Sequence, residues 1–161
     1  MSRTIPPLPA SSTKVSTLES HLGFWLRFVS NHVSANFQKK VEENGVSISE
    51  WVVLRHLFDG DVSSSFELID ALGMTKGAIS KIITRLESKQ LAERISMESD
   101  KRAQQLKLTS AGRKLVPKLA ALADQNEEMF FGHMKKNQYA EMIKELKRIT
   151  KLHSLKQLPV D

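Results

Sequence analysis

Four apolar residues at helical spacing, followed by two short alternating segments, constrain the fold of this 161-residue chain more than any other feature. The apolar stripe consists of Ile79, Ile82, Ile83 and Leu86. Their spacing predicts one buried helix face, and Thr75 just before it supplies an N-cap side chain. Residues 92–97 and 103–109 then alternate in part and are joined by the polar run 98–102, which predicts a β-hairpin with a charged tip. A helix followed directly by such a hairpin is typical of a winged helix.

Two Ser-x-x-Glu patterns precede this helix, and each has the spacing of a capping box. The pairs are Ser47 with Glu50 and Ser64 with Glu67. The first predicts a helix over residues 47–59, and the second predicts a short helix over 64–72 that Gly73 ends in a left-handed conformation. Only a few residues then lead to Thr75, as a helix-turn-helix requires. We therefore expect a winged helix-turn-helix over residues 46–109, in a mainly α fold with a small β-hairpin.

Long apolar patterns flank this domain on both sides. The N-terminal pattern predicts one long helix that Gly45 ends, with an apolar face of Val15, Leu18, Leu22, Trp25, Val29, Val33, Phe37 and Val41. Residues 115–130 and 139–155 predict two further helices, and Pro117 should bend or break the first of them. Residues 1–14 hold three prolines and a serine-rich run, so we expect a flexible N-terminal arm. Packing within the chain is the simplest account of the flanking helices.

The positive charge of the chain is concentrated in one segment. Residues 75–118 hold 11 Lys and Arg against 4 Asp and Glu, a surplus of seven, whereas the whole chain holds 24 against 18. The remainder is therefore close to neutral. Basic residues gathered in this way favour a polyanion as the partner, while an evenly spread surplus would concern mainly solubility.

The polar face of the 75–88 helix has the composition of a DNA-reading surface. If the apolar stripe faces the core, the outward residues are Thr75, Lys76, Gly77, Ser80, Lys81, Thr84 and Arg85. Short polar side chains can reach base edges in the major groove, and lysine or arginine can bind phosphate or guanine. A solvated amphipathic helix would show some of the same residues. The adjoining hairpin and the local charge favour double-stranded DNA as the partner.

At these residues the chain resembles the MarR (multiple-antibiotic-resistance regulator) family of bacterial and archaeal winged-helix transcription factors. The resemblance covers the order of elements from about Val15 to Leu155. Its motifs are L-G-M-T at residues 72–75, R-L-E-x-K-x-L at 85–91, D-x-R at Asp100 and Arg102, and L-x-L-T-x-x-G at 106–112. The chain departs from the family pattern at Gln90, where glycine is frequent, and at Lys101, where a second wing arginine is frequent.

The resemblance implies a dimeric, sequence-specific DNA-binding transcription regulator, most often a repressor. Residues 15–45 and 110–157 would form a helical dimerisation region with a second copy. A two-fold dimer would set its recognition helices about 34 Å apart, so the expected operator is a pseudo-palindrome. Asp100, Lys101 and Arg102 at the hairpin tip join the expected DNA contacts, with the carboxylate of Asp100 aiming the guanidinium of Arg102.

The family also implies a small aromatic or phenolic effector, bound where the dimer helices meet the DNA-binding lobe. The candidate ligand residues combine aromatic surface with cationic or titratable groups: Trp25, Phe28, Trp51, Arg55 and His56. Core aromatics and ordinary surface charges are the alternative reading of the same residues.

Other function classes find little support in the sequence. It has no glycine-rich nucleotide-binding pattern and no H-E-x-x-H, and no two of its five histidines stand three or four residues apart. We therefore expect no enzyme activity, no cofactor and no metal. The lack of cysteine excludes thiol-based sensing, and without an apolar leader or membrane span a cytoplasmic location is expected. The alternative function is a winged-helix protein–protein adaptor without specific DNA binding.

Overall fold

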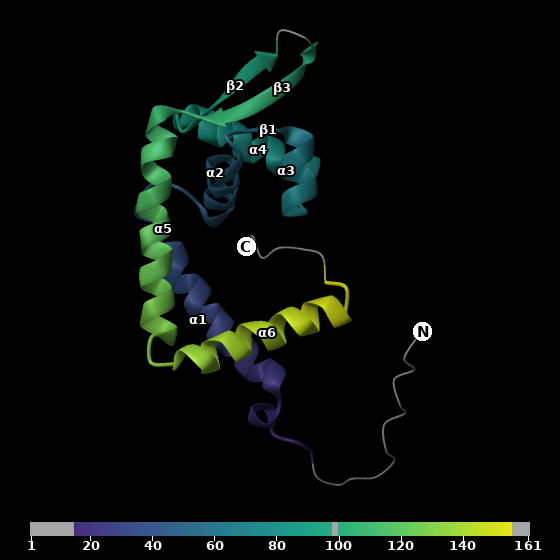
Figure 1. Ribbon diagram of the computed structural model, residues 1–161, viewed down its shortest axis with the longest axis vertical. Coiled ribbons are helices and arrows are strands. Elements are labelled where there is room, and N and C mark those ends of the chain that lie inside the picture. The colour runs from purple at the N-terminus through teal and green to yellow at the C-terminus, as the bar shows by residue number, and fades with distance from the viewer. Residues whose placement is uncertain (1–14, 98–99, 156–161) are drawn as a thin grey trace. The chain divides into compact units, whose positions relative to one another are not determined.

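The computed structural model describes residues 15–97 and 100–155, with the side chains of 15–96 and 105–155. Figure 1 shows the described chain as helices and one small sheet. In chain order the elements are the 3₁₀ turn η1 (Leu18–Ser20), α1 (Leu22–Glu42), α2 (Ile48–Gly60), β1 (Val62–Ser64), α3 (Ser65–Leu72), α4 (Lys76–Ser88), β2 (Ala92–Met97), β3 (Asp100–Leu108), α5 (Ser110–Phe131) and α6 (Lys136–Leu152). The mainly α fold with a small antiparallel sheet is the expected fold class. No described helix is long and apolar enough to span a membrane.

The chain divides after His32 into two compact units, which are described separately. The first holds η1 and the N-terminal part of α1. Here the sequence prediction is wrong in one respect, because the long helix begins at Leu22 and not near Val15. The indole nitrogen of Trp25 donates to the carbonyl of Glu19 (2.8 Å), and the hydroxyl of Ser20 donates to the carbonyl of Thr17 (2.6 Å). These side-chain bonds satisfy the backbone of a separate turn before the helix.

The second unit, from residue 33 onward, contains the apolar core. Helices α2 to α5 and the sheet contribute most of its buried side chains, which are Val41, Val46, Val53, Leu54, Leu57, Leu68, Leu72, Ile79, Ile82, Ile83, Leu86, Ala92, Leu106, Leu108, Val116 and Leu119. Both predicted capping boxes are present, at the starts of α2 and α3. Gly73 ends α3 in the left-handed conformation, with φ of 64°. The predicted helix-turn-helix is therefore confirmed.

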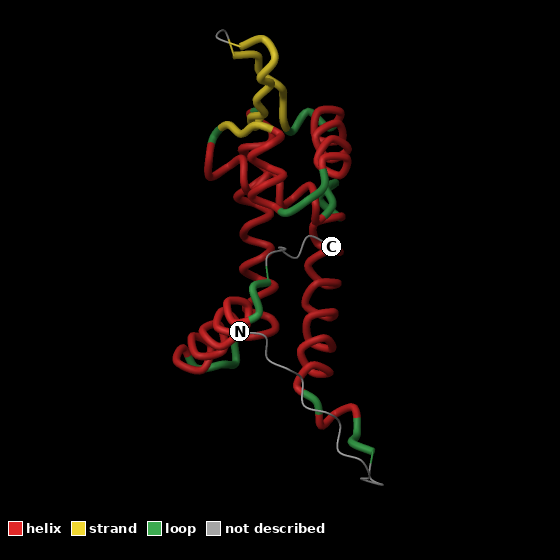
Figure 2. The backbone as a smooth tube through the Cα atoms, turned by 90° about the vertical axis from the view of Figure 1, so that its right-hand side faces the viewer, coloured by secondary structure: helices red, strands yellow, loops and turns green. Residues whose placement is uncertain are grey.

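The sheet is larger than the sequence predicts. Its strand order is β1-β3-β2 with antiparallel pairing, and Figure 2 shows the hairpin of β2 and β3 in yellow. Strand β1 was not predicted, because three residues show no alternation and become a strand only by pairing with β3, where Ser63 lies opposite Leu106. The backbone of β3 begins at Asp100 and not at 103, so the expected turn is too long. A register shift after Ser96 accommodates the early start.

Helix α5 runs unbroken from Ser110 to Phe131, so the break expected at Pro117 is wrong. Proline removes one backbone donor, the amide that would bond to the carbonyl of Arg113. Both Pro117 and Arg113 lie on the exposed side of the helix, where water can solvate that carbonyl. The last predicted helix has the expected length but lies three residues earlier, because α6 begins at Lys136 and ends at Leu152, with Leu155 beyond it.

Candidate nucleic-acid interface

Helix α4 separates its apolar and polar residues as predicted. The four residues of the apolar stripe are buried in the core of the winged helix, with Leu86 fully inaccessible to solvent. All seven residues expected on the outer face are exposed, namely Thr75, Lys76, Gly77, Ser80, Lys81, Thr84 and Arg85. The helix therefore presents one continuous face of short polar and long basic side chains. Side chains of these types can donate hydrogen bonds to base edges and phosphates in a major groove.

Local contacts fix both ends of α4. At the N-terminus the hydroxyl of Thr75 accepts the amide of Ala78 at 3.2 Å, which confirms the predicted N-cap. At the C-terminus Gln90 adopts a φ of 57°, the left-handed conformation that glycine adopts most easily. Between these ends, the hydroxyl of Thr84 donates to the carbonyl of Ser80 at 3.0 Å. This bond sets the direction in which that outward side chain points.

Several hydrogen bonds connect the end of α4 to the start of α5. The hydroxyl of Thr109 donates to the carbonyl of Gln90 (2.7 Å) and accepts the amide of Gly112 (3.1 Å), while its own amide donates to the carbonyl of Leu91 (3.1 Å). A Cβ added at Gly112 would lie 2.1 Å from the carbonyl oxygen of Leu91, so only glycine fits there. The motif L-T-x-x-G thus has a structural reason, because it docks the start of α5 against the residues that follow α4.

Two charge pairs lie at the base of the hairpin, and one of them joins the hairpin to α4. Arg94 on β2 pairs with Glu87 on α4 at 2.8 Å, and Lys107 on β3 pairs with Glu93 on β2 at 3.1 Å. The hairpin thus has a fixed base beside the recognition helix, the layout of a wing. The side chains of Asp100, Lys101 and Arg102 lie outside the described residues, although their backbone belongs to β3. Their expected DNA contacts remain a prediction.

Among the described carboxylates of the winged helix, one at the N-terminus of α3 has a clearly shifted pKa. The backbone amide of Ser64 donates to the carboxylate of Glu67 at 2.6 Å. Hydrogen bonds from Ser64, first from its backbone and then from its side chain, hold the pKa of Glu67 below its ordinary value. The cap is thus made by an ionised carboxylate at neutral pH.

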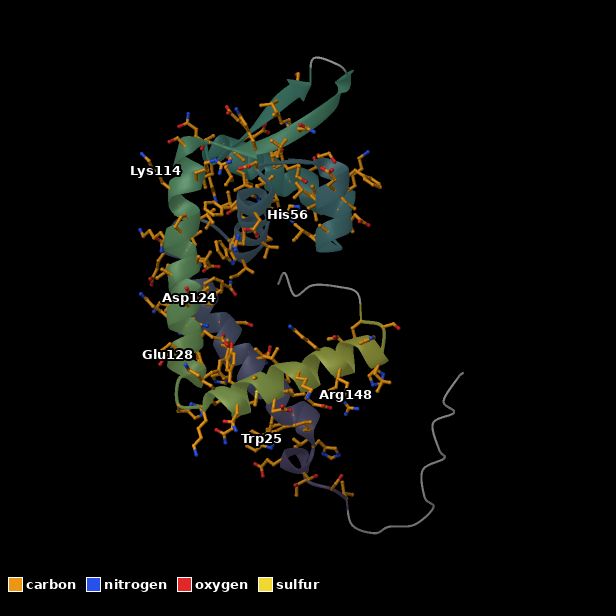
Figure 3. All side chains as sticks on the ribbon, viewed as in Figure 1. Trp25, His56, Lys114, Asp124, Glu128 and Arg148 are labelled. Carbon is orange, nitrogen blue, oxygen red and sulfur yellow. The ribbon has the colours of Figure 1, made fainter. Side chains whose placement is uncertain are left out.

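The five candidate ligand residues fall in both units. Trp25 and Phe28 lie in the first unit with ring centroids 6.3 Å apart, and both are exposed. Trp51, Arg55 and His56 lie on α2 in the second unit; Figure 3 labels His56 on α2 and Trp25 on α1. The ring of Trp51 packs edge-on against Phe37 at 6.2 Å, the packing of a core aromatic. Arg55 is paired with Asp59 of its own helix.

Comparison with known proteins identifies the domain that this geometry describes. The MarR family model matches residues 44–103, from the turn after α1 into β3. The winged-helix domain belongs to the MarR family. Members of this family are DNA-binding transcription regulators and not enzymes. A search of curated proteins finds no matching sequence.

Solved structures share the fold of this chain over most of its length. BpsR of Bordetella bronchiseptica, whose DNA binding is regulated by 6-hydroxynicotinic acid, aligns with a TM-score of 0.73 and 22% identity over 85% of this chain and 98% of its own. A MarR variant of E. coli complexed with operator DNA aligns with 0.71 and 21% over 80% and 92%. MepR, which regulates the multidrug efflux pump MepA of Staphylococcus aureus, aligns with 0.68 and 22% over 84% and 98%.

The side-chain contacts that orient α4 were not predicted from the sequence. Lys89 stands within the motif at residues 85–91, but its partner Glu50 lies 39 positions earlier. Arg94 and Glu87 also form a pair that no local pattern announces. A charged residue gives no signal of which distant charge it will meet, so such pairs become visible only in the folded chain.

Proposed function

We propose that this MarR-family chain is a dimeric, sequence-specific DNA-binding regulator that represses transcription and responds to a small ligand. The observation that carries the proposal is the face of α4, where every residue expected to read DNA is exposed over a buried apolar stripe. Such a helix is held rigidly by its core side and is free to enter a major groove with the other. The basic surplus of residues 75–118 supplies attraction to phosphate.

Exposed apolar side chains in each unit support the dimer. In the first unit these residues are Leu22, Trp25, Leu26, Phe28 and Val29, and on α6 in the second unit they are Met142, Ile143, Leu146 and Leu152. Exposed apolar stripes of this length mark interaction surfaces, because monomeric proteins seldom leave them in water. A second copy would cover them in a two-fold dimer, and its two recognition helices would read a pseudo-palindromic operator.

An aromatic acid is the effector class that we propose. BpsR, which shares the fold, responds to 6-hydroxynicotinic acid, and Trp51 and Arg55 on α2 would offer an aromatic face and a guanidinium to such a ligand. Arg55 already pairs with Asp59 and lies 5.9 Å from the ring centre of Phe58, so an anion would compete with Asp59 for it. By linkage, an effector that weakens DNA binding must itself bind more weakly when DNA is present. His56, Trp25 and Phe28 remain candidates for the same role.

A salt-dependent titration against DNA tests the function. The purified protein is titrated with genomic fragments that include its own upstream region, in the presence of competitor DNA. We expect selective binding whose affinity falls steeply with salt, since phosphate contacts release counterions. Binding that is equally weak for all fragments, with and without aromatic acids, would contradict sequence-specific regulation and favour a protein-partner role.

Single substitutions then assign roles within the proposed site. Lys81→Ala should weaken binding to all sequences and lower the salt slope if Lys81 contacts phosphate. Arg85→Ala should also relax specificity if Arg85 reaches a base.

Arg102→Ala should weaken operator binding by roughly 1–3 kcal/mol if the wing arginine makes groove contacts. Unchanged affinity in a folded Arg102→Ala dimer would refute that role.

A further inference from the structure

We propose that Lys89 is a positioning residue: its ammonium group locks the C-terminal end of α4 to the α1–α2 junction and so fixes the angle at which α4 enters DNA. The inference rests on the proposed DNA-binding function. Lys89 itself is not a base-reading residue in this proposal. It acts through the placement of the side chains that precede it on the helix.

The ammonium group of Lys89 has a complete set of partners. Its Nζ donates to the two carboxylate oxygens of Glu50 at 2.7 and 3.0 Å and to the carbonyl oxygen of Gly45 at 2.8 Å. A lysine ammonium has three hydrogens, so these three acceptors use all of them. An ammonium held in this way has little capacity left for phosphate, which separates Lys89 from the basic residues on the reading face.

Glu50 is the buried half of the lock. Its side chain is 1% exposed, whereas that of Lys89 is 38% exposed. The same carboxylate accepts the backbone amide of Ser47 at 2.7 Å and thereby forms the capping box of α2. Gly45, with φ of 82°, is the turn residue between α1 and α2, and its carbonyl faces the lysine. One ammonium thus joins the turn after α1, the start of α2 and the end of α4.

The neighbouring residues show why this lock controls orientation. Gln90 and Leu91 are held to Thr109 at the start of α5, so residues 89–91 are anchored on both sides. Arg85 lies one turn before Lys89 and lines the same hollow of about 410 Å³. Residues four apart on a helix share one face, so Arg85 lies beside Lys89. If the end of α4 tilted at Lys89, Arg85 and the turns before it would move with it. Base contacts depend on such placement, while phosphate attraction depends on it much less.

The test replaces the buried pair with neutral groups in the full-length protein. Lys89→Met alone would leave the Glu50 carboxylate buried without its partner, and this variant is expected to fold poorly. The double variant Glu50→Gln with Lys89→Met avoids that charge, and glutamine can still make the capping box. Lys89→Arg keeps a cation within reach of both acceptors. The control is Lys114→Met, which removes one exposed positive charge from α5 outside the lock.

Each protein is used to select duplexes from one random DNA library, and affinities for the wild-type consensus and a scrambled duplex are measured against salt. We expect the double variant to discriminate about tenfold less, the size of one lost base-pair contact, with an unchanged salt slope. Lys89→Arg and Lys114→Met should keep the wild-type ratio of affinities for the consensus and the scrambled duplex. Unchanged discrimination in the folded double variant would overturn the proposal, and so would a uniform loss of affinity with a salt slope lower by about one, which indicates a phosphate contact.

Hydrogen exchange separates this proposal from the proposed function. If the wild-type protein selects no DNA sequence, the proposed function is contradicted. The role of Lys89 is then tested by amide exchange of the protein without DNA. Faster amide exchange at residues 85–91 in the double variant, with α3 unchanged, would support the lock. Equal exchange in the two proteins would overturn it.

Discussion

Helices α4 and α6 both carry an apolar stripe at helical spacing, yet only α4 buries its stripe within the described chain. In α4, Leu86 is 0% exposed and Ile79 is 1% exposed, whereas in α6 Met142 is 48% and Leu146 is 40% exposed. The two helices therefore expose different faces. The exposed face of α4 is polar, whereas α6 also exposes its apolar face.

The largest effect should come from the buried stripe. Leu86→Ala removes a fully buried side chain from the winged-helix core, and we expect the free energy of unfolding to fall by roughly 2–5 kcal/mol. Chemical denaturation of the full-length protein, monitored by circular dichroism, measures this loss. A loss under about 1 kcal/mol would show that the core of the winged helix is not as closely packed as its burial indicates.

A charge on the exposed stripe should act on assembly. Leu146→Asp places a carboxylate on the apolar face of α6, and we expect dimer dissociation to become about 100-fold easier, or roughly 3 kcal/mol. Sedimentation equilibrium gives the dissociation constant. Lys151→Ala, on the opposite and polar face of the same helix, is the matched control and should leave it unchanged. Equal dissociation of the two variants would remove α6 from the dimer interface.

The contrast between the two helices also shows how much the sequence could predict. Local signals were sufficient for α4, because Thr75 caps it, its stripe has one period and its outward residues follow from that period. The same signals predicted the capping boxes at Ser47 and Ser64. Each of these features depends on residues within a few positions of one another.

Features that depend on distant residues could not be predicted. Strand β1 exists because Val62 pairs with Lys107, and Lys89 is oriented by Glu50. Pro117 predicted a break, but α5 runs through it because the surrounding helix tolerates one missing bond on its exposed side. The candidate DNA residues could be placed on one face from the sequence, while the lock that sets the direction of that face could not.

A smaller effect tests the junction that joins α5 to the winged helix. Gly112→Ala brings a Cβ within 2.1 Å of the Leu91 carbonyl oxygen, so the backbone must shift, and we expect a loss of about 1–3 kcal/mol in unfolding free energy. Gly77→Ala is the matched control, because nothing lies within 4 Å of its added Cβ and alanine favours a helix over glycine by up to about 1 kcal/mol. A stabilised Gly112→Ala variant would contradict the close docking of α5.

The smallest effect compares two exposed carboxylates whose pKa values are both lowered, by different partners. Hydrogen bonds from Ser64 lower the pKa of Glu67 on α3, and hydrogen bonds from the guanidinium of Arg148, together with its charge, lower the pKa of Glu145 on α6. Each contributes stability above its unfolded-state pKa, and that contribution is lost as the pH falls through the lowered folded-state value. Raising NaCl from about 0.1 to 1 M shortens the Debye length from about 10 to 3 Å, which screens the charge of Arg148 more than the backbone amide of Ser64. In carbon-detected NMR titrations we therefore expect salt to return the pKa of Glu145 toward its ordinary value and to change that of Glu67 much less. Equal responses would mean that Glu67 is held by charge, such as that of His56, and that its backbone cap contributes little.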